Sequence, residues 1–152
     1  MISKFVLTAV AVAAVVVTAS AAEGLRPFKD YVPSKEVYNV TLIKVRPNRM
    51  DEYLAGLRQT WADSCEVSKK LGDVTECSIL VSTTPGNSNY NVLLLTRSPS
   101  AALDDPDEAR FNKFETEFRK KLAEDKQDQL VEGYEEMRTL FDEQNFRRID
   151  FK

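Results

Sequence analysis

Two cysteines and a complete lack of histidine limit the chemistry that this 152-residue chain can perform. Without histidine, Ser-His-Asp and Cys-His nucleophilic systems, His-ligated zinc or iron and axial-His haem are excluded. The sequence also has no glycine-rich phosphate-binding loop. We therefore expect no metal and no cofactor. The sequence assigns no catalytic residue, and we lean against an enzyme.

The cysteine pair, Cys65 and Cys77, predicts a disulfide if the chain is exported. Cys65 falls near the end of a predicted helix, and Cys77 falls a few residues into the strand that returns from it. Both side chains are expected to project into the layer between helix and sheet. The alternative is two small buried thiols that never meet.

An acidic cluster stands before the second predicted helix, at Asp104, Asp105, Asp107 and Glu108. Its spacing does not match an EF-hand loop, and a helix N-terminus attracts acidic residues through its dipole. We interpret the cluster as helix capping and solvated charge.

The N-terminus has the three parts of a secretory signal peptide, which we place at residues 1–22. A short segment carrying Lys4 precedes an uncharged apolar run over residues 5–19, and Ala19-Ser20-Ala21 supplies the small residues of a cleavage site. An uncleaved membrane anchor is the alternative, but the apolar stretch is at the short end of the ~20 residues that a spanning helix needs. We expect an exported protein, periplasmic or secreted, with no membrane association once the signal is removed.

The charge balance argues against nucleic acid as a partner. The whole chain has a net charge of −3, and removal of the signal with Lys4 leaves −4. No basic stripe with interleaved aromatic residues is present to offset that balance.

The remaining chain predicts one α+β domain over residues 37–152, after a linker-like lead-in over residues 23–36. Polar residues 123–129 interrupt the apolar stripe of the second helical region, so that either one helix bends there or two helices meet. The expected order is βαββαβ, a ferredoxin-like four-stranded antiparallel sheet with helices on one face and extra helix before the last strand. The expected strands are 37–46, 74–83, 90–97 and 146–151, with helices over 49–71 and from 107 to about 141.

Both faces of the predicted sheet are apolar in their middle, which a solvent-exposed face would not be. On the first strand, we assign Asn39 and Thr41 to the face away from the helices. A second copy of the chain could cover that face, since most soluble oligomers are symmetric homodimers. The alternative is that the long C-terminal helix folds back over it.

Trp61, the only tryptophan, follows the apolar stripe of the first helix. Its ordinary role would be core packing, and its functional role would be as a wall of a pocket between helix and sheet. Polar residues that we assign to the second sheet face would either line a ligand cavity or be satisfied at a dimer seam. The candidate pocket residues are Asn39, Thr41, Trp61, Ser78, Asn91 and Arg148.

The segment Val40 to Leu54, with Pro47-Asn48 at its turn, resembles the first strand, turn and helix start of the dimeric α/β-barrel superfamily. That superfamily includes antibiotic-biosynthesis monooxygenases, stress-responsive barrel proteins and NIPSNAP-type domains. The resemblance covers roughly residues 37–152, mostly as topology, and Asn48 stands where glycine is common. It implies sheets paired face to face in a dimer and a ligand held between sheet and helices, and it informs fold far more than function.

Three functional hypotheses follow. The first is an exported homodimeric domain that binds a small molecule or a protein partner. The second is a cofactor-independent monooxygenase or isomerase that would use Asn91, Arg148, Trp61 and a tyrosine such as Tyr38 or Tyr90. The third is a structural envelope-associated protein, which would need a large exposed apolar patch after dimerisation.

Overall fold

The computed structural model describes residues 24–84 and 88–152. The predicted signal peptide at residues 1–22 lies outside these residues, and so does the middle of the predicted turn between the second and third strands. No helix in the two described segments is long and apolar enough to cross a membrane.

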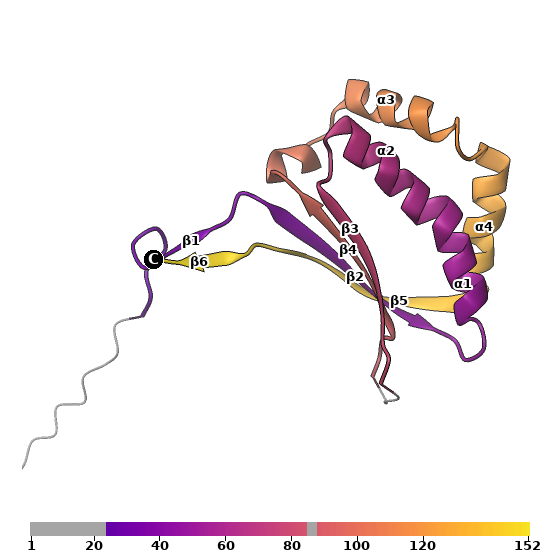
Figure 1. Cartoon of the computed structure of the whole chain (residues 1–152), viewed down its shortest axis with the longest axis horizontal. Helices are drawn as coiled ribbons and strands as arrows, with labels where there is room; N and C mark the ends of the chain where they lie inside the picture. The colour runs from indigo at the N-terminus through magenta and orange to yellow at the C-terminus, as the bar shows by residue number, and fades with distance from the viewer. Residues whose placement is uncertain (1–23, 85–87) are drawn as a thin grey trace, which may run out of the picture.

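Four antiparallel strands form the central sheet in the order β3-β4-β2-β5 (Figure 1). These strands are β2 (Val37–Val45), β3 (Glu76–Val81), β4 (Val92–Ser98) and β5 (Arg138–Phe146). With a helical segment between β2 and β3 and another between β4 and β5, the chain order is βαββαβ. The ferredoxin-like fold expected from the sequence is therefore confirmed.

The first helical segment runs continuously from Met50 to Leu71 but contains a π-helical turn. It comprises α1 (Met50–Leu57), the π turn η1 (Arg58–Ala62) and α2 (Asp63–Leu71). Asn48, with φ of 63°, makes the turn before it, which asparagine tolerates better than most residues. Gly72 ends the segment in the left-handed region with φ of 84°, as its position in the sequence predicts.

The second helical region consists of two helices, which settles one of the sequence alternatives. After the short 3-10 turn η2 (Ala101–Asp104), α3 covers Glu108–Phe118 and α4 covers Glu124–Met137. The Asp107 side chain accepts a hydrogen bond from the Arg110 backbone N–H at 3.0 Å, so it caps α3 as expected.

The predicted end of this region is wrong, because the helix stops at Met137 and the fourth strand starts at Arg138. The apolar stripe in the sequence predicts a helix that continues to Phe141, but that side chain is 52% exposed. Residues 138–146 pair instead with the free edge of β2, where they satisfy backbone groups that a helix would have left unpaired. Phe141 is the extra residue of a bulge, since Leu42 pairs with Asp142 and Ile43 pairs with Leu140.

A two-stranded ribbon projects from one end of the sheet (Figure 1). It is made by β1 (Tyr31–Pro33) and β6 (Ile149–Phe151), with Val32 paired to Asp150. The predicted lead-in thus contributes a short strand. The segment predicted as the fourth strand of the sheet, residues 146–151, supplies its second half to this ribbon instead.

All helices lie on one face of the sheet (Figure 1). Ile43 and Val45 on β2 are 0% and 1% exposed and pack with residues of α1 and α4. Because α4 lies on this side, the described chain does not fold its C-terminal helix over the opposite face. We call that opposite face the outer face, and its central side chains are Val40, Leu42, Leu93, Leu95, Ser78 and Leu80.

The predicted face assignment of the first strand is wrong. Thr41 pairs directly with Leu94, and Asn39 pairs with Thr96, so both share a face with the buried Ile43 and Val45. Paired residues of antiparallel strands project to the same side, which places Asn39 and Thr41 on the helix side. The alternation itself was predicted, but two apolar faces give no local signal of which one is covered.

Cys65 on α2 and Cys77 on β3 form a disulfide, with their Cα atoms 6.4 Å apart. Cys77 pairs with Thr96 on the helix side of the sheet, as the sequence predicts. The bridge therefore connects the helix layer to the sheet. Nearby, Val67 packs with Phe118 and Leu122 in a second apolar cluster that joins α2 to α3.

Candidate functional site

A cavity of about 280 Å³ lies between the helices and the sheet, and we call it the aromatic cavity. The first helical segment contributes Tyr53, Thr60 and Trp61 to its lining. Leu94 on β4 and Arg138 at the start of β5 line it from the sheet. The remaining wall comes from α3 and α4, through Phe114, Glu115, Phe118, Gln127, Val131 and Tyr134.

Tyr53 is the most deeply buried polar side chain of this cavity. The residue is 0% exposed, and its hydroxyl has no hydrogen-bond partner among the described residues. Burial raises the pKa of Tyr53 to about 12, although the positive charge of Arg138 acts in the opposite direction. The hydroxyl therefore stays protonated near neutral pH and is a free donor.

Tyr134 packs directly against Tyr53 in the lining, with the two rings edge to face and their centroids 5.3 Å apart. The Tyr134 hydroxyl lies 2.7 Å from the Thr60 hydroxyl. Because Thr60 donates its own proton to the Gly56 carbonyl at 3.1 Å, Tyr134 is the donor in this pair. Burial is the main reason that the pKa of Tyr134 is raised. The Tyr134 proton is thus already engaged, whereas that of Tyr53 is not.

Arg138 supplies a positive charge to the cavity. Its guanidinium carbon lies 5.6 Å from the ring centroid of Tyr53 and 5.3 Å from that of Tyr134. These distances allow cation–π attraction to both rings. Within the described segments, no carboxylate oxygen lies within 4.0 Å of this guanidinium. Pairing with Val45 in the sheet holds the Arg138 backbone in place.

The π turn η1 brings Thr60 and Trp61 to the cavity. Isolated π turns within α-helices are rare and frequently lie at functional sites. Here the turn changes the helical register between Leu57 and Cys65, both of which are buried. Both ends of the helix can then face the sheet while Trp61 lines the cavity between them.

The other charged residue of the lining is already neutralised. Glu115 on α3 forms an ion pair with Arg119 at 2.9 Å. Arg119 also donates to the Gln127 side chain at 2.6 Å, which connects α3 to α4. Arg138 is consequently the charge in the aromatic cavity that lacks an oppositely charged partner in the described chain.

Of the six predicted pocket residues, the structure places only Trp61 in this cavity. Asn39 donates to the side chains of Glu143 and Asn145 at 2.9 and 3.2 Å, a cross-strand pairing on the helix side. Thr41 is half-buried on the same face. Ser78 lies on the outer face opposite Leu95.

Asn91 and Arg148 have structural partners elsewhere. The Asn91 side chain accepts from the Val45 backbone N–H at 2.7 Å and donates to the Val45 carbonyl at 3.0 Å, so it extends the pairing of β2 and β4. Arg148 precedes β6 and forms ion pairs with Asp150 and Glu36. Neither lines the aromatic cavity. The tyrosines that the sequence suggested, Tyr38 and Tyr90, do not line it either.

Tyr53, Tyr134 and Arg138 are the site residues that sequence reasoning missed. The apolar stripe predicted for the first helix passed through Leu54 and Leu57. Leu57 is buried as expected, but its fully buried neighbour is Tyr53 and Leu54 is only half-buried. One local signal could have identified Tyr53. It lies on one helix face with three other lining residues, at a spacing of three or four positions: Leu57, Thr60 and Ser64. Arg138 could not be found in this way, because its position depends on where α4 ends.

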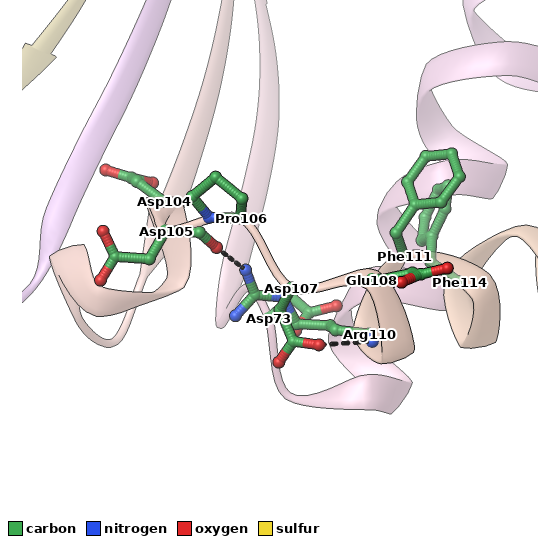
Figure 2. Close-up of a pocket in the computed structure, with 9 residues that line it drawn as sticks. All are labelled: Asp73, Asp104, Asp105, Pro106, Asp107, Glu108, Arg110, Phe111 and Phe114. Carbon is green, nitrogen blue, oxygen red and sulfur yellow. Dashed lines mark hydrogen bonds and ion pairs between the residues drawn. The ribbon is translucent and has the colours of Figure 1, made fainter.

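A larger hollow of about 590 Å³ lies beside the start of α3 (Figure 2). It contains the acidic cluster together with Asp73 and Arg110. Arg110 occupies its centre by donating to the Leu103 and Asp105 carbonyls at 2.6 and 2.7 Å. Figure 2 shows the Asp104 and Asp105 side chains lying apart from those of Asp107 and Glu108. Within residues 24–84 and 88–152, no group of three or more carboxylates or cysteines could hold a metal ion.

The chemistry available in the aromatic cavity is therefore binding through donors rather than proton abstraction. A phenol with a pKa of about 12 is a poor base near neutral pH. Glu115, the carboxylate of the lining, is paired with Arg119. Tyr53 and Arg138 offer a hydroxyl donor and a positive charge to whatever enters.

The comparisons with known proteins concern fold only. No protein-family model matches the chain, and no curated protein matches it. Solved structures with a similar fold include protein SO0527 from Shewanella oneidensis, at 13% identity and a TM-score of 0.48, covering 80% of this chain and 99% of that one. A NIPSNAP family protein from Agrobacterium tumefaciens is 20% identical with a TM-score of 0.39, covering 75% and 90% of the two chains.

A further similar structure is SnoaB, a cofactor-independent oxygenase from Streptomyces nogalater. It is 9% identical with a TM-score of 0.36, and the match covers 78% of this chain and 94% of that one. The NIPSNAP family is one of those that the sequence resemblance names. At such identities the likeness is one of fold and assigns no activity to this chain.

Proposed function

We propose that this protein is an exported homodimer that binds a small molecule in the aromatic cavity. The observation that carries the proposal is the fully buried Tyr53, a lining residue of the cavity whose hydroxyl has no hydrogen-bond partner within the described segments. Buried polar groups in folded proteins are nearly always hydrogen-bonded, and leaving one unpaired costs about 1–3 kcal/mol. A ligand that accepts a hydrogen bond from Tyr53 would remove that cost.

The composition of the lining also supports small-molecule binding. Ligand sites are typically concave and mostly apolar, with a few convergent polar groups. Here Trp61, Phe114 and Phe118 supply the apolar surface, and Tyr53 and Arg138 supply the polar groups. The volume lies near the lower end of the usual range of about 300–1,000 Å³, which favours a small ligand.

The outer face supports the homodimer. Its centre is aliphatic on three neighbouring strands, through Leu42, Leu93 and Leu80. Figure 1 shows no helix on this side of the sheet. A second copy presents the same apolar surface, and a two-fold axis would bring the two faces together. Each copy would then retain its own aromatic cavity on the far side of its sheet.

Export is supported by two independent features. The sequence carries a predicted signal peptide at residues 1–22, and Cys65 is bonded to Cys77. Disulfides persist mainly in oxidising compartments, which include the periplasm and the cell exterior.

A cofactor-independent oxygenase or isomerase is the second candidate. The unpartnered Tyr53 donor favours it, because donors aimed at a developing oxyanion stabilise a transition state. We rank it second since the cavity offers no unpaired carboxylate and no histidine as a base. Turnover of a bound aromatic substrate by the purified protein would reverse this ranking.

The binding proposal can be tested with N-phenyl-1-naphthylamine, a neutral dye whose fluorescence rises in apolar cavities. We expect saturable binding by the purified chain and a large loss of affinity in Val131→Phe, which adds a ring at a partly exposed position of the lining. Glu132→Phe adds the same ring to the neighbouring exposed position of α4 and serves as the control. Equal dye binding by the two variants and the unmodified protein would show that the dye, and the proposed ligand, do not use this cavity.

A further inference from the structure

The aromatic cavity contains an excess of hydrogen-bond donors and positive charge over acceptors and negative charge. Tyr53 has a free hydroxyl donor, and Arg138 has no carboxylate partner within the described chain. Glu115 contributes a negative charge, but Arg119 neutralises it at 2.9 Å. The Thr60 hydroxyl accepts from Tyr134 and donates to Gly56, so that it is satisfied within the fold.

We propose that the cavity selects a small organic carboxylate with an aromatic or aliphatic body. This inference rests on the proposed binding function and names the class of ligand. The carboxylate would accept hydrogen bonds from Arg138 and Tyr53, and the body would lie against Trp61, Leu57 and Phe118. A carboxylate fits this donor set because it carries two acceptor oxygens and the charge opposite to that of a guanidinium.

The two tyrosine rings contribute to this selection through the position of Arg138. The guanidinium lies near the centroids of both rings, which stabilise its charge without offering it an anionic partner. The positive charge is thus held at the cavity by aromatic contacts, and no carboxylate of the described segments pairs with it. The raised pKa of Tyr53, about 12, keeps its hydroxyl a donor across the physiological pH range.

A neutral ligand of the same shape would leave the charge of Arg138 unmatched, and a cationic one would be repelled by it. Hydrogen bonds in which one group is ionised are roughly twice as strong as those between neutral groups. We therefore expect a preference of at least about tenfold for a carboxylate over its alcohol analogue.

Trp61 provides the measurement, because it is the only tryptophan and lines the cavity. The probes are 4-phenylbutanoate, 4-phenylbutan-1-ol and 4-phenylbutylamine, which share one body and differ in the terminal group. Titration of Trp61 fluorescence in the purified chain should give the tightest binding for the carboxylate, weaker binding for the alcohol and the weakest for the amine.

Two substitutions at Arg138 test whether this residue causes the preference for the carboxylate over the alcohol. Arg138→Gln should bring the carboxylate and the alcohol to similar affinities, whereas Arg138→Lys keeps the charge and should retain part of the difference. Arg148→Gln changes the net charge by the same amount outside the cavity and should retain the full preference. The ratio of the affinities for the carboxylate and the alcohol, measured in the unmodified protein, tests the carboxylate inference even if a variant fails to fold.

The possible failures are distinguishable. If the alcohol binds as tightly as the carboxylate, or if Arg138→Gln leaves the ratio unchanged, the carboxylate inference is overturned. Binding of the neutral dye, and its loss in Val131→Phe, would still stand in that case. If the dye does not bind in the cavity and none of the three probes changes Trp61 fluorescence, the binding function itself is refuted.

Discussion

The ring of Tyr134 lies against the helix backbone at Gly56, with no room between them for a side chain. A Cβ atom at position 56 would lie 2.7 Å from Cε1 of Tyr134 and 2.8 Å from its hydroxyl oxygen. Both are shorter than any normal contact, so that Tyr134 would have to move. The contact between α1 and α4 at the aromatic cavity therefore depends on a glycine.

Gly56→Ala should destabilise the protein by up to about 2 kcal/mol. Overpacking of this kind typically costs about 1–3 kcal/mol, and the better helix propensity of alanine offsets about 1 kcal/mol of it. Urea denaturation followed by circular dichroism measures the change. Gly133→Ala on α4 is the matched control, because its Cβ would meet only the flexible end of Met137 at 3.4 Å. The control should be neutral or slightly stabilising, and an equal loss in both variants would contradict this explanation.

Removal of the Cys65–Cys77 disulfide should lower the free energy of unfolding by about 3 kcal/mol. The bridge closes a loop with a sequence separation of 12, and cross-linking so short a loop constrains the unfolded chain by about this amount. Urea denaturation with and without a reductant measures the effect. The chain has only two cysteines, so a Cys65→Ala/Cys77→Ala variant should show no response to reductant. Coincident transitions of the oxidised and reduced protein would refute the prediction.

Stability should fall as pH rises from 10 to 12 through the ionisation of Tyr53. The pKa of this group is about 12 in the folded state against a model value of 10.0, so the unfolded chain loses its proton first. The contribution of the protonated Tyr53 hydroxyl to the free energy of unfolding is complete below pH 10, and it declines as the pH approaches 12. A difference of two pKa units corresponds to about 2.7 kcal/mol as an upper bound. Comparison of the unfolding free energies of the protein and Tyr53→Phe between pH 9 and 12 measures it, and parallel curves would contradict the assignment.

Leu93→Glu should convert the proposed homodimer to a monomer. Leu93 lies on β4 opposite Leu42, near the middle of the outer face, and a dimer would place two carboxylates in an apolar interface. Light scattering coupled to size-exclusion chromatography measures the mass. Phe111→Glu makes a comparable change at an exposed position on α3 and should leave the dimer intact. An unmodified protein that is monomeric at the highest soluble concentration would refute the dimer.

Much of the fold was predictable from local sequence signals. The spacing of apolar residues indicated the first helical segment, Gly72 indicated its end, and the positions of Cys65 and Cys77 allowed a bridge between helix and sheet. Trp61, which the sequence suggested as a possible pocket wall, lines the aromatic cavity, and its helical register with Leu57 is local information. Each of these features depends on neighbours within a few turns or one short loop.

The tertiary structure decided the rest. Whether Asn39 and Thr41 face the helices depends on which side of the sheet is covered, and both sides have similar apolar centres. A strand pattern repeats every two residues and does not distinguish its two faces when both are apolar. The end of α4 and the start of β5 likewise depend on the free edge of β2, which is about 100 residues earlier in the chain.

The site itself shows the same division. The sequence alone determined that this chain has no histidine chemistry, that it has one tryptophan and two cysteines, and the order of its β and α segments. Only the packing of α1, α4 and β5 brought Tyr53, Tyr134 and Arg138 together, since these residues are up to 85 positions apart along the chain. Local periodicity encodes each element, but the contacts that leave the Tyr53 hydroxyl unpaired beside Arg138 arise only when three elements meet.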